Sequence, residues 1–327
     1  MLKDRILLTL KFFDLQDYPL TLLELRKFLL ADVQQIKFVI NTEWDLISVN
    51  GIQSAPATAE EILACLNNEC KAEVEQQYGF YCLAGRRRVI LQRWQNFLFG
   101  IRRERLIRRF VGGLRHVPFV RGVGLAGSQS MGLQKPDSDI DLFIIVDSRF
   151  LWLARTLVTA YFQVLGRRRH GRHIANRFCL NHYVAAGKTI GELRNLYTAW
   201  EYAKLRPLVC EPAVADFQQN NREWISRFFP SFAESFVFVR ALADEPTGRQ
   251  NFKSPHFEPA NGGRRSLPQR IVERLFLGSF GRWLEARLQN WQLPRIRQEE
   301  FILVRDDELS FHPQSKQREL LQKFFVG

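Results

Sequence analysis

The segment that decides the fold is a glycine-serine turn followed by two aspartates one residue apart. It reads Gly127-Ser128-Gln129-Ser130-Met131-Gly132 and, six residues later, Asp139-Ile140-Asp141-Leu142. An apolar segment precedes it at 117–125 and another follows it, as expected for two buried strands. Residues i and i+2 of a strand share a face, so Asp139 and Asp141 are expected to point together.

Paired carboxylates beside a bare turn indicate a site for a metal ion and a phosphate. Two adjoining carboxylates repel each other, and a hard divalent cation relieves that repulsion. A turn made of Gly127, Ser128 and Ser130 exposes backbone N–H groups and hydroxyls to which phosphate oxygens can bind. The pattern therefore predicts phosphoryl or nucleotidyl transfer, with Asp139 and Asp141 as metal ligands.

The composition favours a protein with packed cores and more than one domain. The chain has 327 residues, of which 46% are hydrophobic and 13% aromatic. The best candidate membrane span, 151–165, carries Arg155 and is too short, and the N-terminus lacks a signal-peptide pattern. Five cysteines without a CxxC pair fit reduced thiols. We therefore expect a cytoplasmic protein without membrane contact or structural zinc.

Charge is distributed unevenly along the chain. Residues 1–85 carry 7 Lys/Arg and 12 Asp/Glu, so the rest of the chain carries a net charge of +18. Between residues 86 and 125 the sequence has eleven arginines and one acid, Glu104. A basic zone before the Gly-Ser turn suits an anionic substrate, but it could equally solvate one face of a helix. The sequence leaves both interpretations open.

Residues 1–91 are predicted to form a winged-helix-like module. Three helices are expected, over 1–16, from the capping box Thr21–Glu24 onward, and from a second box, Thr58–Glu61, to about Lys71. A β-hairpin is expected next, with strands at 78–83 and 89–91 around a basic tip.

The charge of this module argues against simple DNA binding. Its candidate recognition helix, 59–75, carries five glutamates against Lys71 alone, and phosphates would repel that face. Only the predicted hairpin tip is basic. The sequence therefore favours a structural or protein-contact role over nucleic-acid binding, without excluding the latter.

Three further regions are expected after residue 91. A basic linking helix occupies 92–114, a central domain 115–205, and a mainly helical region 206–327 with a loop at 244–268. In the central domain we expect a helix at 150–165, a basic loop at Arg167–His173, a strand at 178–184, and a helix opened by a third capping box, Thr189–Glu192. In the last region we expect a helix at 268–291, a hairpin from 301–304 and 309–311, and a closing helix at 315–325.

The central motif resembles the nucleotidyltransferase superfamily of the DNA polymerase beta type. The resemblance rests on Gly127-Ser128 and, ten residues on, Asp139-Ile140-Asp141-Leu142, with a strand-like segment on each side. It implies an α+β fold with a mixed sheet backed by helices. It also implies that the Gly-Ser turn holds a nucleoside triphosphate, with ATP as the expected nucleotide, and that Asp139 and Asp141 bind Mg²⁺ or Mn²⁺.

The sequence departs from the family pattern at the third catalytic position. The family places a carboxylate on a later strand, where it activates the acceptor hydroxyl, but the matching segment 177–184 contains no acid. Asn181 is the expected counterpart by strand alternation, and its amide could ligate a metal or orient a hydroxyl. His182 could act as a base or be a structural residue. Asp306 or Asp307 could restore the acid from another segment.

Two hypotheses of function follow from these features. The first is a Mg²⁺-dependent nucleotidyltransferase that transfers a nucleoside monophosphate to a hydroxyl acceptor. The second is a nucleotide-binding regulatory or interaction module that kept the fold and lost turnover. RNA, DNA or a protein could serve as acceptor or partner through the basic segments Arg102–Arg109 and Arg167–His173.

Overall fold

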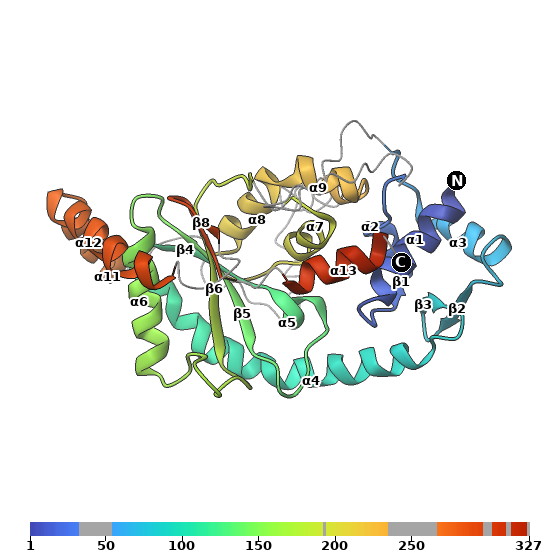
Figure 1. The fold of residues 1–327 in the computed structure, drawn as a ribbon, viewed down its shortest axis with the longest axis horizontal. Coiled ribbons are helices and arrows are strands. Elements are labelled where there is room, and N and C mark those ends of the chain that lie inside the picture. Colours follow the sequence, from blue (N-terminus) through green and yellow to red (C-terminus); the bar gives the residue numbers. More distant parts are fainter. Residues whose placement is uncertain (33–53, 192–193, 235–266, 297–302, 312–314, 326–327) are drawn as a thin grey trace, which may run out of the picture.

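The computed structural model describes residues 1–32, 54–191, 194–234, 267–296, 303–311 and 315–325. The molecule is elongated, with the N-terminal elements at one end, a mixed sheet in the middle and a pair of helices at the other end (Figure 1). Helices and a mixed sheet agree with the predicted α+β class. No helix within these ranges is both long and apolar enough to cross a membrane.

The N-terminal part combines three helices with a small antiparallel sheet. Its elements are α1 (Leu2–Asp14), β1 (Leu20–Thr21), α2 (Leu22–Lys27), α3 (Ala59–Asn68), β2 (Val74–Gln77) and β3 (Phe80–Leu83), with sheet order β1-β3-β2. The two predicted capping boxes are confirmed, since Thr21 and Thr58 each accept from the backbone N–H three residues on. Helix α3 ends at Asn68, earlier than expected.

The predicted hairpin was placed wrongly. Its two strands are β2 and β3, joined at Tyr78 and Gly79, whose φ angles of 52° and 78° suit a two-residue hairpin turn. Residues 89–91 belong instead to the start of helix α4 (Arg88–Val111), where Val89 and Ile90 are buried. The basic residues 86–88 are therefore not a hairpin tip. Arg86 pairs with Asp14 at 2.7 Å and with Asp17 at 2.6 Å, at the end of α1.

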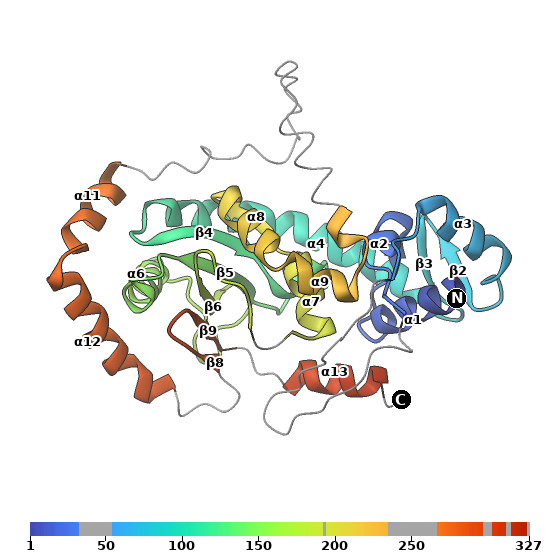
Figure 2. The ribbon, with the colours of Figure 1, turned by 90° about the horizontal axis from the view of Figure 1, so that it is seen from above.

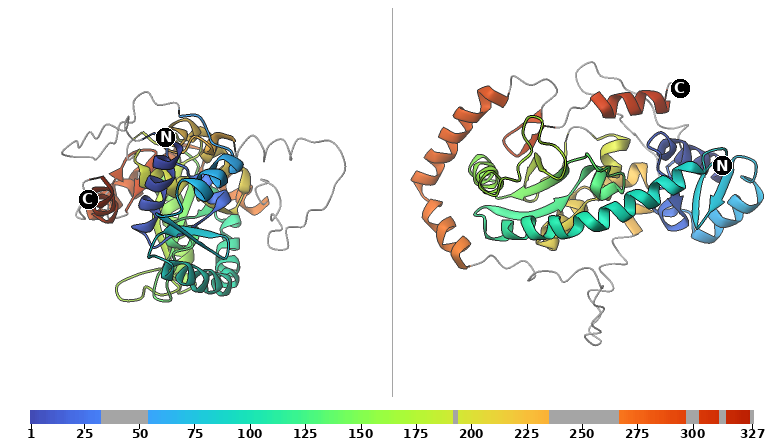
Figure 3. Two further views of the ribbon diagram at one scale, coloured as in Figure 1. Left: turned by 90° about the vertical axis from the view of Figure 1, so that its right-hand side faces the viewer. Right: turned by 90° about the horizontal axis from the view of Figure 1, so that it is seen from below.

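Helix α4 runs along most of the molecule, from the N-terminal part to beneath the central sheet (Figure 3, right). A 3₁₀ helix, η2 (Gly112–His116), leads from it into the sheet. The described central elements are β4 (Val120–Leu125), α5 (Gly127–Met131), β5 (Ile140–Val146), α6 (Leu151–Val164), β6 (Phe178–Ala185), α7 (Leu196–Ala203), β7 (Arg206–Val209), α8 (Glu211–Asn220) and α9 (Arg222–Phe228).

Helix α7 begins later than the third predicted capping box. Asn195 caps it, because the Asn195 Oδ1 accepts from the Thr198 N–H at 2.9 Å and the Thr198 Oγ1 accepts from the Asn195 N–H at 3.1 Å. The Thr189 hydroxyl instead donates to the Asn220 carbonyl. Glu192, the other end of the predicted box, lies outside the described residues.

The central sheet is mixed, with the order β7-β4-β5-β6-β9-β8. Strands β5 and β6 are parallel and connected through α6, and the other neighbours are antiparallel. Leu142 and Ile144 of β5 pack in the same core as residues of α4 and α6, whereas Phe143 and Ile145 pack with residues of α7, α8 and α9 (Figure 2). The sheet thus lies between two helical layers.

The C-terminal region contributes to both ends of the molecule. Its described elements are α11 (Leu267–Phe276), α12 (Ser279–Ile296), β8 (Leu303–Val304), β9 (Glu308–Ser310) and α13 (Ser315–Phe325). The single helix expected at 268–291 is two helices, and most of the predicted loop 244–268 lies outside the described residues. The predicted hairpin is present as β8 and β9, and β9 extends the central sheet beside β6.

The N-terminal part and the central sheet share one buried core. Trp200 of α7 lies in edge contact with Phe12 and Phe13 of α1, at ring separations of 6.2 and 5.1 Å. Phe324 of α13 also packs against Phe12, at a ring separation of 5.3 Å. The position of the N-terminal part on the sheet is therefore fixed by aromatic packing.

A half-buried charge cluster reinforces this junction. Glu24 of α2 accepts from Arg93 of α4 at 2.7 Å and from Lys204 beside α7 at 3.0 Å. Burial alone would raise the pKa of Glu24, but Lys204 and Arg93 outweigh it and hold that pKa well below its usual range. One carboxylate therefore connects three elements that are far apart in the sequence.

We predict that Glu24→Gln destabilises the protein by about 1–3 kcal/mol, because it leaves Arg93 and Lys204 without a counter-charge in a half-buried position. A depressed pKa stabilises the folded state at pH values above the unfolded pKa, so this contribution should be lost as the pH falls below about 4. Urea unfolding at pH 7 and pH 3 measures both effects. The control is Glu223→Gln, whose exposed pair with Arg227 should contribute under about 0.5 kcal/mol.

Candidate functional site

The glycine-serine turn lies directly against the second aspartate. The Ala126 N–H, at the end of β4, donates to the Asp141 carbonyl of β5 at 3.0 Å. Gly127 follows with a φ of +59°, and a Cβ atom there would lie 2.2 Å from the Asp141 Oδ2. A side chain at position 127 would therefore be strained by the backbone and would collide with the carboxylate.

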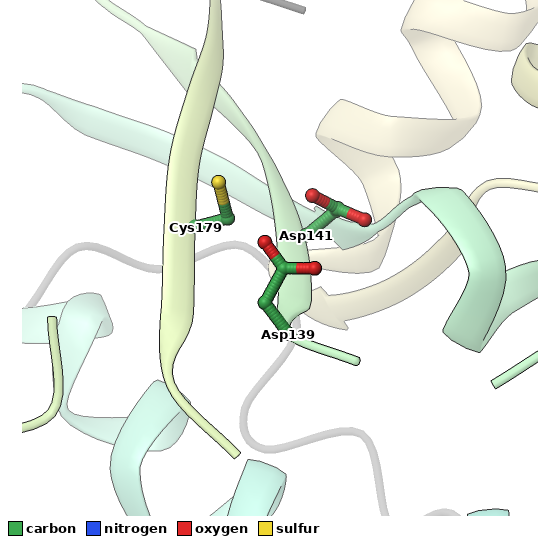
Figure 4. A group of neighbouring side chains, drawn as sticks. All are labelled: Asp139, Asp141 and Cys179. Carbon is green, nitrogen blue, oxygen red and sulfur yellow. The ribbon is translucent and has the colours of Figure 1, made fainter. Parts of the chain in front are cut away.

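The two aspartates converge, as predicted, at the start of β5. Asp139 immediately precedes the strand, and Asp141 is its second residue. Their carboxylate oxygens and the Cys179 Sγ of β6 all lie within 4.8 Å of one another (Figure 4). Asp141 and Cys179 are paired in register, which explains why a thiol occupies the third corner. No other His, Cys, Asp or Glu of the described residues joins this group.

A buried arginine fixes the residues that precede Asp139. Arg103 of α4 is 3% exposed and donates to the Pro136 carbonyl at 2.9 Å and to the Ser138 carbonyl at 2.8 Å. It also donates to the Ser138 Oγ at 3.1 Å and to the Asn176 Oδ1 at 2.8 Å. The long helix therefore positions both the turn before β5 and the loop before β6.

A second arginine contacts the site itself. Arg169, in the basic loop between α6 and β6, donates from Nη1 to the Asp139 Oδ2 at 2.6 Å and to the Cys179 Sγ at 3.3 Å. Burial opposes the charge of Arg169, but its contacts with Cys179 and Asp139 prevail and raise the pKa of the guanidinium. The guanidinium therefore stays charged and neutralises part of the acidic pair.

The donor set fits a hard divalent ion at the two carboxylates. Asp139 and Asp141 offer close oxygen ligands, which Mg²⁺ and Mn²⁺ prefer. Burial, followed by the charges of Asp141 and Asp139, raises the pKa of the Cys179 thiol well above its usual range. A protonated thiol is a poor ligand for Mg²⁺ and cannot replace the carboxylate base of the family pattern.

Asn181 was inferred from regular strand alternation, and β6 is not regular at this point. Asp141 pairs with Cys179, but Phe143 pairs with His182, so β6 contains one extra residue between the two pairs. This irregularity breaks the strand alternation from which Asn181 was inferred. Asn181 itself accepts from the Phe311 N–H through its carbonyl at 2.8 Å. Its role at the site remains a prediction.

His182 is a core residue. It is 5% exposed, its ring centre lies 4.7 Å from that of Phe143, and its Nε2 lies 3.3 Å from a carboxylate oxygen of Glu308. Glu308 is buried as well and belongs to β9, which pairs with β6 at this position. A histidine held in this way does not face an acceptor hydroxyl.

Asp306 and Asp307 do not restore the missing acid. Asp307 accepts from Ala185 through its carbonyl and pairs with Lys188 at 2.6 Å. Ala185 lies six residues beyond Cys179 on β6, which corresponds to roughly 20 Å along a strand. Both residues therefore lie near the far end of the strand from the aspartates.

The two serines of the turn, Ser128 and Ser130, differ in whether their hydroxyl groups already make a hydrogen bond within the protein. The Ser130 Oγ donates to the Gly127 carbonyl at 3.0 Å, so its hydroxyl stabilises the turn. The Ser128 carbonyl accepts from the Leu133 N–H at 2.8 Å, and its half-exposed hydroxyl makes no hydrogen bond with a described residue. Ser128 is thus the better placed of the two to meet a phosphate.

The two basic segments meet on the surface. Phe110 of α4 lies between them, with the Arg109 guanidinium 5.6 Å and the Arg167 guanidinium 4.7 Å from its ring centre. Arg102, Arg105 and Arg109 are exposed and spaced so that they share one face of α4. A basic surface therefore extends from α4 to the loop that carries Arg169.

Residues 107–179 match the family model described as the nucleotidyltransferase domain. The match includes β4, the Gly-Ser turn, both aspartates and Cys179. The resemblance to the nucleotidyltransferase superfamily is thereby confirmed for this segment. Neither the curated proteins nor the solved structures yielded a match to the chain.

Sequence reasoning missed three residues of the site. Cys179 was interpreted only as a buried thiol, and Arg103 and Arg169 were recognised only as members of basic segments. Their contacts depend on the pairing of β6 with β5, on the bonds of the 167–169 loop to Phe178, and on the packing of α4 beneath the sheet. No local pattern signals either feature.

We predict that Gly127→Ala weakens Mn²⁺ binding by at least about tenfold, because the new methyl group would force Asp141 away from Asp139. Isothermal titration with Mn²⁺ measures the change. The matched control is Gly187→Ala, whose φ is +82° but whose Cβ would meet nothing within 4 Å. Equal Mn²⁺ affinity in the two variants would show that the Gly127–Asp141 contact does not shape the metal site.

Proposed function

We propose that the chain is a divalent-metal-dependent nucleotidyltransferase that transfers a nucleoside monophosphate from a nucleoside triphosphate, with ATP as the expected donor, to a hydroxyl acceptor. The observation that carries the proposal is the convergence of Asp139 and Asp141 beside the Gly127 turn, within the segment that matches the nucleotidyltransferase family model. General nucleotidyl transfer agrees with that match, whereas the metal, the nucleotide and the acceptor are our inference.

Each residue of the site has a defined task in this proposal. Asp139 and Asp141 hold Mg²⁺ or Mn²⁺, and Gly127 and Ser128 bind the triphosphate through backbone N–H groups and a hydroxyl. The bound ion would offset the negative charge that develops on the phosphate oxygens. The acceptor oxygen attacks the α-phosphorus, the bond to the bridging oxygen breaks, and pyrophosphate leaves with that oxygen.

The acceptor hydroxyl must lose its proton to a group other than a third carboxylate. Asn181 is proposed to orient the acceptor hydroxyl, because an amide can accept a hydrogen bond but cannot take the proton. His182 is too buried for that task. The proton therefore passes to solvent or to a phosphate oxygen, and turnover is expected to be slow.

A second candidate function is a nucleotide-binding regulatory or interaction module without turnover. It is favoured by the protonated thiol of Cys179 at the third corner, where the family pattern has an acid. Incubation with labelled nucleoside triphosphates, Mg²⁺ or Mn²⁺, and a broad acceptor panel separates the two functions. Nucleotide binding without pyrophosphate release across the panel supports the module and contradicts the enzyme.

We predict that Asp139→Ala and Asp141→Ala each abolish metal-dependent nucleotide binding and lower pyrophosphate release by at least about 100-fold. Pyrophosphate release coupled to a colorimetric assay gives the rate, and equilibrium dialysis with Mn²⁺ gives the binding. Asp307→Ala is the matched control, because that carboxylate pairs with Lys188 away from the site. Activity that survives both aspartate substitutions would contradict the site assignment.

We further propose that the basic surface of α4 and the 167–173 loop holds a polyanionic acceptor, an RNA or DNA strand with a free terminal hydroxyl. Arg102, Arg105, Arg109, Arg168 and Arg172 have no acidic partner among the described residues. Arg103 ties the same helix to the turn before Asp139. A strand that lies along the helix would therefore be held in a fixed position relative to the site.

We predict that Arg105→Glu combined with Arg109→Glu weakens binding of a single-stranded oligonucleotide by at least about tenfold and flattens its salt dependence. Fluorescence anisotropy from 50 to 300 mM salt measures both quantities. The control is Arg282→Glu, an exposed position on α12 at the other end of the molecule. A flat salt response of the unaltered protein would exclude a nucleic-acid partner and leave a protein or small-molecule acceptor.

The N-terminal part is proposed to be a winged helix that contacts a protein. Its order of α1, β1, α2, α3 and a hairpin, with β1 paired to β3, supports the fold assignment. Exposed acids on and beside α3, namely Glu60, Glu61 and Glu69, argue against contact with DNA.

A further inference from the structure

Arg169 occupies an unusual position for a residue of an exposed basic loop. Its guanidinium bridges two of the three groups that converge at the candidate metal site, Asp139 and Cys179. The Arg169 side chain is 41% exposed, while that of Asp139 is 15% exposed. The arginine is therefore the more exposed partner of the pair and lies against Asp139.

The backbone of Arg169 is fixed although its side chain is exposed. The Arg169 N–H donates to the Phe178 carbonyl at 3.0 Å, and the Phe178 N–H donates to the Arg167 carbonyl at 2.9 Å. These bonds tie the loop to the first residue of β6, one position before Cys179. Any movement of the guanidinium is consequently a change of side-chain rotamer, with the main chain held in place.

A divalent ion and this guanidinium compete for the same carboxylate. Asp139 can satisfy either cation, and two cations on one carboxylate repel each other. Because the Arg169 side of this pair reaches solvent, the guanidinium can be rehydrated when it leaves Asp139, and the exchange for a metal ion costs little. A metal ion that binds Asp139 and Asp141 should therefore release Arg169 from Asp139.

A released Arg169 would lie next to the phosphates of a bound nucleotide. The turn at Gly127 lies against Asp141, and Arg169 lies against Asp139, so the two aspartates stand between the turn and the arginine. A triphosphate that reaches from the turn across the metal would meet the guanidinium. The planar guanidinium fork suits two phosphate oxygens at once.

We propose that Arg169 is a phosphate-binding residue that changes partners. It pairs with Asp139 in the free protein, gives way to the divalent ion, and then binds the triphosphate or the departing pyrophosphate. This role rests on the proposed nucleotidyl-transfer site and adds to it a residue that places the leaving group. It also gives a role to the contact between Arg169 and Asp139, which the exposed Arg172 of the same loop does not make.

The test uses two binding measurements for which the proposal predicts opposite effects. Arg169→Ala should strengthen Mn²⁺ binding to the nucleotide-free protein by about threefold to tenfold, because a competing cation is gone. The same variant at saturating Mn²⁺ should bind ATP at least about tenfold more weakly, because a charged phosphate contact is lost. Electron paramagnetic resonance of free Mn²⁺ gives the first affinity, and a fluorescent ATP analogue gives the second.

Two further variants sharpen the result. Arg169→Lys keeps a cation but not the fork, so its ATP affinity should lie between those of the unaltered protein and Arg169→Ala. Arg282→Ala removes an exposed arginine of α12, which is not part of the site or of the proposed basic surface, and should change both affinities less than twofold. Both experiments use the full chain.

The proposal is overturned if Arg169→Ala leaves both affinities unchanged, or moves both in the same direction, as general damage to the site would. Failure of the proposed reaction gives a different result. If the unaltered protein binds Mn²⁺ and ATP and shows the opposite shifts but releases no pyrophosphate, nucleotidyl transfer is wrong and the role of Arg169 stands. If it binds no Mn²⁺, both are wrong.

Discussion

The contact between Gly127 and the Asp141 carboxylate is the constraint on which the site depends. The hydrogen bond from the Ala126 N–H to the Asp141 carbonyl holds the end of β4 against β5, and the missing Cβ of Gly127 lets the carboxylate approach. The turn and the two carboxylates proposed to bind the metal are consequently held together at the ends of two neighbouring strands. Phosphate and metal can then be held side by side without any movement of the main chain.

The surroundings of this unit compensate its charge in two ways. Arg103 is buried and donates to carbonyl, hydroxyl and amide oxygens, so it fixes the geometry of the segment before Asp139 and adds positive potential from beneath. Arg169 contacts Asp139 directly from the solvent side. The third corner carries a neutral thiol, which adds no negative charge. The site therefore has arginines that can bind anions and carboxylates that can bind cations, but its third corner offers no carboxylate to accept a proton.

Much of the fold and the heart of the site could be predicted from the sequence, because their signals are local. The two N-terminal capping boxes, the strands around the Gly-Ser turn and the convergence of Asp139 and Asp141 depend on neighbours within a few residues. The N-terminal hairpin was predicted at the wrong position because its first strand, β2, is polar and because its turn, Tyr78-Gly79, includes a non-glycine residue with an uncommon positive φ. The third catalytic position was assigned to Asn181 from regular strand alternation, which an extra residue in β6 interrupts. The contacts of Arg103 and Arg169 arise only when distant segments pack together.

We propose above all that Asp139 and Asp141 jointly hold a divalent ion next to the Gly127 turn. Anomalous X-ray diffraction at the manganese edge, from crystals grown with Mn²⁺ and a non-hydrolysable ATP analogue, locates the ion directly. We predict an anomalous peak about 2.0–2.3 Å from an oxygen of each aspartate, with phosphate density between the peak and the turn. A peak elsewhere, or nucleotide density away from Gly127 and Ser128, would contradict it.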